Sequence, residues 1–134
     1  MSKELKNEEI EFQIQFYKGI LKRKPDFIEA LVALGDLYTK KGYYEEGLDI
    51  DRKLARLRPY SSNVLYNLAC SYSLLNELPK ALEAIQKAIE CGYDDFEHLN
   101  KDPDLSNLRS DENFQKYFSD VKSKQPTKSK NSEL

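Results

Sequence analysis

The sequence contains little of what several classes of protein require. Its 134 residues include five glycines, five prolines, two cysteines, one histidine and no tryptophan. An all-β sandwich needs a turn about every eight to twelve residues, so this small number of glycines and prolines favours helices. Since 40% of the residues are apolar and 33% are charged, the chain can still build one core beneath a charged surface. We therefore expect a single helical domain.

Long apolar runs and a strong net charge are also absent. No stretch approaches the roughly 20 apolar residues that cross a bilayer, and the first residues are too polar for a signal peptide. We expect a cytoplasmic protein without a membrane span. The formal net charge of −2 gives no broad positive field for binding phosphates, so we expect no nucleic-acid partner.

Few residues have the chemistry that catalysis requires. Cys70 and Cys91 form no CxxC pair and have no neighbouring histidine, so we interpret both as reduced packing residues. His98, the single histidine, lies in an acidic stretch over 94–104. A small metal-dependent hydrolase built on this stretch is a remote alternative, but helix caps and solvated carboxylates explain the acidic residues more simply. We expect no catalytic residue, no metal and no cofactor.

An internal repeat organises the chain. Five residues recur identically after 34 positions, and a 34-residue period with two helices per unit is typical of tetratricopeptide repeats. The sequence Leu31-x2-Leu34-Gly35-x2-Tyr38 resembles the start of such a repeat, as does the equivalent stretch 34 residues later. The recurring residues are Leu31, Leu34, Tyr38, Leu48 and Lys53, which return as Leu65, Leu68, Tyr72, Leu82 and Lys87.

Small residues recur where the two helices of a repeat would approach closely. Gly35 and Ala69 form one such pair, and Gly47 and Ala81 form another. A small side chain at these positions lets two antiparallel helices pack at short distance. Asp51 departs from the pattern because it occupies a slot that is usually aromatic in this family.

The resemblance implies an all-α superhelix of helix-turn-helix repeats. We place the first full repeat at 28–60 and the second at 62–94. At the same offset, residues 7–24 align with the second helix of a repeat whose first helix is missing. We expect Asn7 to cap this helix and Pro25 to end it, because asparagine is a preferred N-cap and proline cannot continue a helix.

The repeat pattern stops after the second unit. Asp102 and Pro103 fall where a third repeat would need an apolar and a small residue, and this pair reads as the cap and first position of a short helix. A terminal repeat needs a cover for its open side, so we expect 95–122 to form capping helices. The folded domain is then 1–122, and the basic tail 123–134 is expected to be disordered.

Members of this family bind an extended peptide or a partner helix in a concave groove lined by the first helices of successive repeats. The resemblance therefore implies a noncatalytic adaptor with a protein or peptide partner. Asn63 and Asn67 could pair with a peptide backbone, and Tyr66 with Val32 offers apolar contact. Asp36 would repel a carboxylate, so we do not expect the clamp that some members use for chaperone C-termini. The expected groove residues are Glu29, Val32, Ala33, Asp36, Thr39, Lys40, Asn63, Tyr66, Asn67, Cys70, Ser73 and Leu74.

Two aromatic residues in the first helix raise a second hypothesis. Phe12 lies far around the helix from the apolar stripe that contains Ile14, and Phe16 lies near Phe12. This helix could bury Phe12 against a second copy of the chain or against a partner protein. The alternative function is a self-association module, in which Phe12 and Phe16 of the first helix mediate a homodimer. Ordinary repeat packing is the simpler explanation for Phe16.

Overall fold

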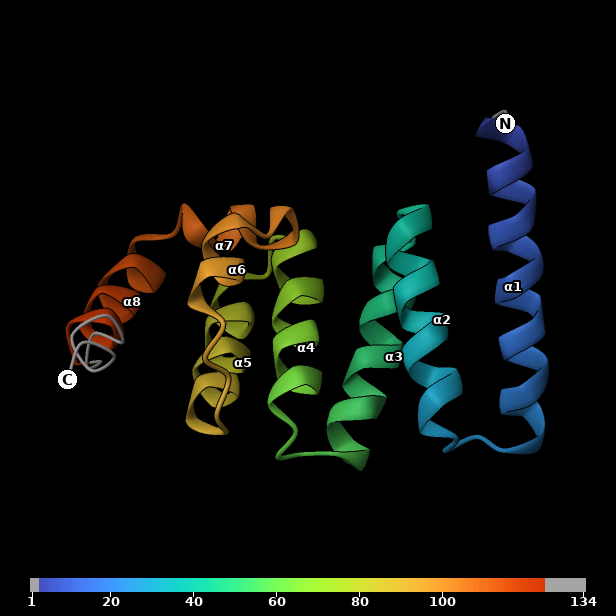
Figure 1. The fold of residues 1–134 in the computed structure, drawn as a ribbon, viewed down its shortest axis with the longest axis horizontal. Helices are drawn as coiled ribbons and strands as arrows, with labels where there is room; N and C mark the ends of the chain where they lie inside the picture. The colour runs from blue at the N-terminus through green and yellow to red at the C-terminus, as the bar shows by residue number, and fades with distance from the viewer. Residues whose placement is uncertain (1–2, 125–134) are drawn as a thin grey trace, which may run out of the picture.

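The computed structural model describes residues 3–124, and within them the chain is an all-α superhelix, as the sequence predicts. The helices stand side by side in a row, with α1 at one end and α8 at the other (Figure 1). In chain order they are α1 (Lys3–Arg23), α2 (Ile28–Lys41), α3 (Tyr44–Leu57), α4 (Ser62–Leu74), α5 (Leu78–Glu90), α6 (Phe96–Lys101), the 3₁₀ helix η1 (Pro103–Leu105), α7 (Ser106–Arg109) and α8 (Glu112–Lys124).

Two helical hairpins, α2–α3 and α4–α5, form the centre of the array. Their turns repeat as the sequence does: Gly42 after α2 has φ of 81°, and Asn76 after α4, which lies 34 residues later, has φ of 60°. In both turns, the N–H of the next residue bonds to the carbonyl oxygen five residues before it, at 2.8 and 2.9 Å. Glycine and asparagine are the residues that adopt this left-handed conformation at least cost, which explains their place in the turns.

Helix α1 packs along α2 through one apolar face. Ile14 is buried there together with Leu34 and Leu37 of α2. The helix begins at Lys3, so Asn7 lies inside it, and the expectation that Asn7 caps the helix was wrong. The Lys-Glu-Leu-Lys sequence before Asn7 consists of good helix formers, which extend the helix toward the N-terminus. Pro25 follows the last helical residue by two positions, as expected.

The segment after α5 covers the second repeat. Asp95 caps α6 by accepting the backbone N–H of residue 98, and Asp102 caps η1 by accepting that of residue 104. Asp111 accepts the N–H of Phe114 at 3.1 Å, at the start of α8. The acidic residues of this segment therefore begin short helices. The fully buried residues that join it to α4 and α5 are Leu99, Leu105 and Leu108.

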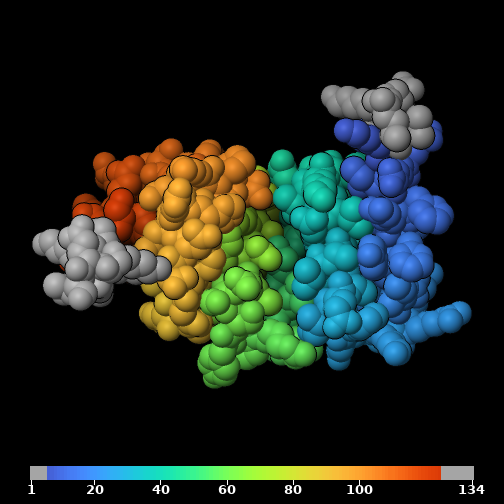
Figure 2. Space-filling model, in the orientation of Figure 1, coloured from blue at the N-terminus to red at the C-terminus, as the bar shows by residue number. Residues whose placement is uncertain are grey.

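Helix α8 extends slightly further than the sequence indicates. It ends at Lys124, so Ser123 and Lys124, assigned above to the tail, are helical. The helix has a stacked pair of rings, Phe114 and Phe118, that packs into the core of the second repeat. The rest of the basic tail, 125–134, lies outside the described residues. The side chains of α1 and those of the closing helices occupy opposite ends of the molecule (Figure 2).

Candidate functional site

A cleft of about 330 Å³ lies between the two repeats; we call it the concave cleft. Most of its lining residues come from α2 and α4, the first helices of the two hairpins. Asp51 and Leu54 of α3 also line it, and α6 and the residues around η1 border it on one side. Val32 and Asp36 reach it from α2, while Asn67 and Cys70 reach it from α4. Helices of different repeats therefore form a single surface, which is the arrangement needed to hold a partner segment.

The structure brings most of the expected groove residues to this cleft. Besides those four, Ala33, Thr39, Tyr66 and Leu74 line it. Asn67 is exposed and has no hydrogen-bond partner among the described residues, so its amide is free to bind a ligand.

The other expected residues lie elsewhere. Glu29 and Lys40 are exposed but do not line the cleft, and Asn63 lines a neighbouring hollow that shares Asn67 with it. Ser73 is fully buried behind the cleft, where its hydroxyl accepts the N–H of Leu108 at 3.1 Å. This serine joins α4 to the closing segment, so it has no surface to offer a partner.

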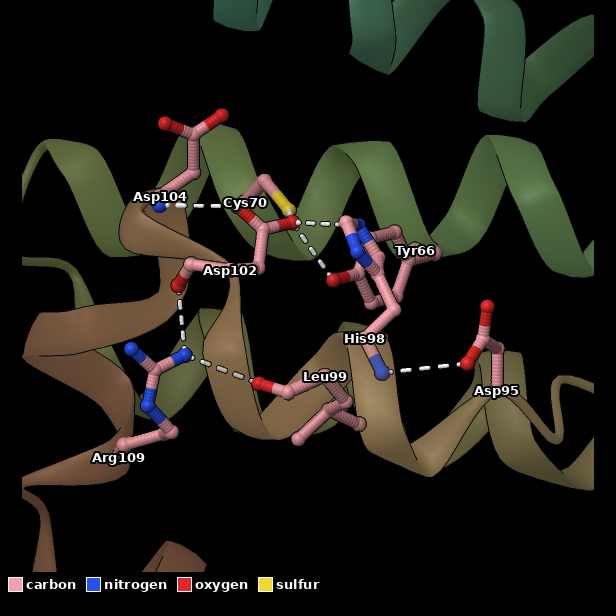
Figure 3. Close-up of polar contacts among 8 residues, drawn as sticks. All are labelled: Tyr66, Cys70, Asp95, His98, Leu99, Asp102, Asp104 and Arg109. Atoms are coloured by element: carbon pink, nitrogen blue, oxygen red, sulfur yellow. Dashed lines mark hydrogen bonds and ion pairs between the residues drawn. The ribbon is translucent and has the colours of Figure 1, made fainter.

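Asp102 is the centre of a hydrogen-bond network beside the cleft (Figure 3). Asp102 is 8% exposed, and its Oδ2 atom accepts the hydroxyl of Tyr66 at 2.7 Å. The same oxygen lies 3.2 Å from Nε2 of His98 and 3.7 Å from Sγ of Cys70. Arg109 donates to the main-chain oxygen of Asp102 at 2.6 Å. These contacts connect α4, α6 and α7 through one residue.

The network changes the acidity of the groups that touch it. Burial raises the pKa of the Tyr66 hydroxyl, and the hydrogen bond to Asp102 raises it further. Burial also raises the pKa of the Cys70 thiol, and the nearby Asp102 charge adds to the effect. Cys70 is therefore a protonated packing residue and a poor nucleophile, in line with the interpretation from sequence. Tyr66 forms the wall of the cleft, with its ring stacked on that of Tyr93 at 4.3 Å.

A second buried carboxylate, Asp51, lines the concave cleft from α3. It is 8% exposed and accepts a short hydrogen bond from the hydroxyl of Ser71 on α4. Burial raises the pKa of Asp51 to about 6, the nearby Asp36 raises it too, and the Ser71 hydrogen bond opposes the shift. The hydrogen bond between Asp51 and Ser71 joins the two repeats. Asp51 occupies the position that is usually aromatic in repeats of the kind that the sequence resembles.

The concave cleft is acidic. Four aspartates line it, and no lysine or arginine is among its lining residues. Burial raises the pKa of Asp104, the charges of Asp102 and Asp36 raise it further, and His98 opposes the shift. Asp36 forms an ion pair with Lys40 at 3.1 Å, but both side chains are exposed and the pair gains little. The neighbouring hollow adds Asp94 and Asp95.

Sequence reasoning placed Asp36 in the groove but missed the other three aspartates that make the cleft acidic. The sequence shows Asp51 only as a departure from the repeat pattern, and that departure is the available signal. Asp102, Asp104 and His98 belong to the acidic stretch, and their positions in the sequence do not indicate that they border the cleft. Nothing in the 34-residue period specifies where a segment outside the repeats folds back.

The acidic stretch does not assemble a metal site within the described residues. No group of three histidine, cysteine or acidic side chains there is close enough to hold a metal ion. Asp95 and Asp102 are used as helix caps, as the simpler interpretation has it. Over the same residues, no helix is long and apolar enough to cross a membrane.

Comparison with known families agrees with the geometry. A model of the tetratricopeptide repeat matches residues 28–60 and 62–90, which are the two hairpins that form the cleft. Residues 28–60 and 62–90 are therefore two tetratricopeptide repeats. Repeats of this family are noncatalytic protein-interaction modules, so the two matched hairpins are of a kind that binds other proteins.

Individual relatives share this repeat architecture. A chloroplastic protein of Arabidopsis thaliana is 38% identical over 80 residues, which are 58% of this chain and 24% of that protein. A crystal structure of MamA superposes with a TM-score of 0.60 at 27% identity, covering 67% of this chain and 53% of that one. MamA from residue 41 onward, from Desulfovibrio magneticus RS-1, gives a TM-score of 0.61 at 20% identity, with 91% and 72% covered. The matched region is thus about a quarter of the plant relative.

Proposed function

We propose that the chain is an adaptor that holds an extended, basic segment of a partner protein in its concave cleft. The observation that carries this proposal is the charge of the cleft: four aspartates line it and no lysine or arginine does. A lysine or arginine side chain entering the cleft would reduce the repulsion among these carboxylates and form charge-assisted hydrogen bonds with them.

The shape and the free polar groups of the cleft favour an extended segment. The two hollows share Tyr66, Asn67 and His98, so together they form one continuous surface across the second repeat. The amide of Asn67 can donate to and accept from a peptide bond, which fixes the direction of a bound main chain. Val32 is 45% exposed on the opposite wall and supplies an apolar contact. The main chain of the partner segment would then set its orientation in the cleft, and its basic side chains would provide the specificity of binding.

Fluorescence anisotropy with two matched peptides tests the proposal. The probes are fluorescein-labelled peptides in which serine alternates with either lysine or glutamate, and the titrations are run at low ionic strength. We expect the lysine peptide to bind and the glutamate peptide not to bind. Replacing both Asp36 and Asp104 by asparagine should weaken binding of the lysine peptide about fivefold, and Asn67→Ala should weaken it by a similar factor of about five.

A charge-matched control separates the cleft from the overall charge of the protein. Asp49 and Asp120 are exposed and line neither the concave cleft nor the neighbouring hollow. Their double replacement by asparagine changes the net charge equally and should leave the dissociation constant within a factor of about two. Equal affinity for both peptides, or equal losses in the two double variants, would show that the cleft does not select basic segments.

A further inference from the structure

The outer face of α1 has the pattern of a helix-pairing seam. Five residues follow one another at intervals of three and four: Glu9, Phe12, Phe16, Gly19 and Arg23. All five are exposed, with Phe12 at 72% and Phe16 at 55%. This spacing places them along one side of the helix, and the apolar face that packs on α2 lies roughly opposite.

Nothing among the described residues covers this seam. α1 stands at the end of the row with α2 on its inner side (Figure 1). Glu11, on the flank of α1, contacts the end of α2 and the turn that follows it. Its Oε1 atom accepts the hydroxyl of Tyr43 at 2.9 Å and lies 3.4 Å from Nζ of Lys41. Neither exposed phenylalanine ring belongs to the core that α1 shares with α2, although the Phe16 ring makes an edge contact with the neighbouring Tyr17 ring at 5.3 Å. Burying a phenylalanine side chain contributes about 1.5 to 3 kcal/mol, so pairing this face would be favourable.

The charges of α1 make the seam complementary to itself. Its exposed acidic residues Glu8 and Glu9 lie in the first third of the helix, while Lys22 and Arg23 form its last turn. Two copies in antiparallel orientation would place the acidic part of each beside the basic end of the other. Two copies in parallel orientation would place like charges together, which is unfavourable.

We propose that α1 pairs in antiparallel orientation with α1 of a second copy of this chain, with Phe12 of each copy packed against Phe16 of the other. In this register, the two-fold axis passes the helix midway between the two rings. Glu8 of one copy then flanks Lys22 of the other, on the same side of the seam. Gln15 lies on the same side of the seam, midway between Glu8 and Lys22 in the sequence. The Gln15 side chains of the two copies would therefore meet near the two-fold axis.

The pairing leaves the concave cleft open. No residue of α1 lines the cleft, so a two-fold dimer through α1 would carry two free clefts. Such a dimer would bind a partner that presents two basic segments more tightly than the monomer does, because the second contact becomes intramolecular. The inference is independent of what the cleft binds.

Charge reversal tests the orientation. We expect the wild type to show a concentration-dependent dimer by size-exclusion chromatography with light scattering. Glu8→Lys and Lys22→Glu should each raise the dimer dissociation constant about three- to tenfold, because each creates two like-charge contacts. The double variant should return to the wild-type value, since it restores both opposite-charge contacts. If the two helices paired in parallel, the double variant would not show this loss and recovery of the dimer dissociation constant.

Two further variants complete the test. Phe12→Glu should give a monomer with an unchanged helical circular-dichroism spectrum, because Phe12 is exposed and its loss leaves the core intact. Lys18→Glu is the matched control, since Lys18 is exposed but lies off the seam, and it should dimerise as the wild type does. In a Cys91→Ser background, a short bismaleimide should cross-link Gln15→Cys and not Lys18→Cys. A wild type that stays monomeric at all concentrations, or a double variant that is not rescued, overturns the proposal.

Discussion

The hydroxyl of Tyr66 donates a 2.7 Å hydrogen bond to Oδ2 of Asp102, which lies 36 residues later in the sequence. The bond joins the first helix of the second repeat to the turn that starts η1. The other carboxylate oxygen of Asp102 accepts the N–H of Asp104 at 3.0 Å and so caps η1. One side chain therefore both starts the closing segment and fastens it to the repeat, beside the concave cleft.

Removing this side chain should destabilise the domain. We expect Asp102→Ala to lower the free energy of unfolding by about 3 kcal/mol, because it leaves the buried Tyr66 hydroxyl without an acceptor and removes the cap of η1. Asp102→Asn keeps a carbonyl acceptor and should cost only about 1 kcal/mol. Urea denaturation followed by circular dichroism measures both changes.

The control for this prediction is Asp94→Ala. Asp94 is an exposed neighbour whose side chain makes no hydrogen bond to the described residues, so its replacement should change the free energy of unfolding by less than about 0.5 kcal/mol. If Asp102→Ala costs no more than Asp94→Ala, the network does not hold the closing segment in place.

The repeats could be predicted from sequence because apolar and small residues recur at a fixed offset. Leu31 and Leu65, 34 residues apart, are both buried, and the turn residues Gly42 and Asn76 have the same spacing. Asp102 could be predicted as a cap because proline follows it directly. The cap can be recognised from residues adjacent in the sequence, and the repeats can be recognised from the 34-residue spacing.

The electrostatics of the cleft could not be predicted in the same way. The repeat pattern places Ser73 on the groove side of its helix, but Leu108 of the closing segment packs there and takes its hydroxyl as an acceptor. Asp102 and Asp104 reach the cleft only because that segment folds back over α4. Long-range docking of a segment outside the repeat has no periodic signal in the sequence.

The buried Asp51 carboxylate should make stability depend on pH. Its pKa is raised from 3.8 to about 6 in the folded state, so the folded protein holds this proton more tightly than the unfolded chain. The resulting stabilisation is complete below about pH 4 and is lost as the pH rises through about 6. Asp51→Asn keeps an acceptor for Ser71 and removes the buried charge. We expect it to stabilise the protein by about 1 to 3 kcal/mol at about pH 7.5 and by little at about pH 4.

Urea titrations of both proteins at the two pH values check this prediction. Asp49→Asn, an exposed aspartate on the same helix, is the control and should keep the pH dependence of the wild type. An Asp51→Asn variant that is less stable than the wild type at the higher pH would mean that the ionised carboxylate contributes to stability through its bond to Ser71.

The two cysteines should react at different rates. Cys70 is 7% exposed, and burial beside Asp102 raises its thiol pKa, while Cys91 is partly exposed at the end of α5. Since the thiolate is the reactive form, iodoacetamide should modify Cys91 first in the native protein and reach Cys70 only after unfolding. Mass spectrometry of tryptic peptides identifies the modified residue. Modification of Cys70 at the rate of Cys91 would mean that the cleft opens under native conditions.

Two glycines in the first repeat should respond to alanine in opposite directions. At Gly47 on α3, a Cβ atom would lie 3.4 Å from Oγ1 of Thr39, an ordinary contact, and the second repeat already has Ala81 at this position. Gly47→Ala should therefore stabilise the protein by about 0.5 to 1 kcal/mol through helix propensity.

At Gly35 on α2, a Cβ atom would lie 3.2 Å from Cγ2 of Ile50 and 3.3 Å from Oδ1 of Asp51. Gly35→Ala should therefore cost about 1 kcal/mol net. Urea midpoints at constant m-value measure both changes, and stabilisation by Gly35→Ala would show that α2 and α3 can move apart without loss.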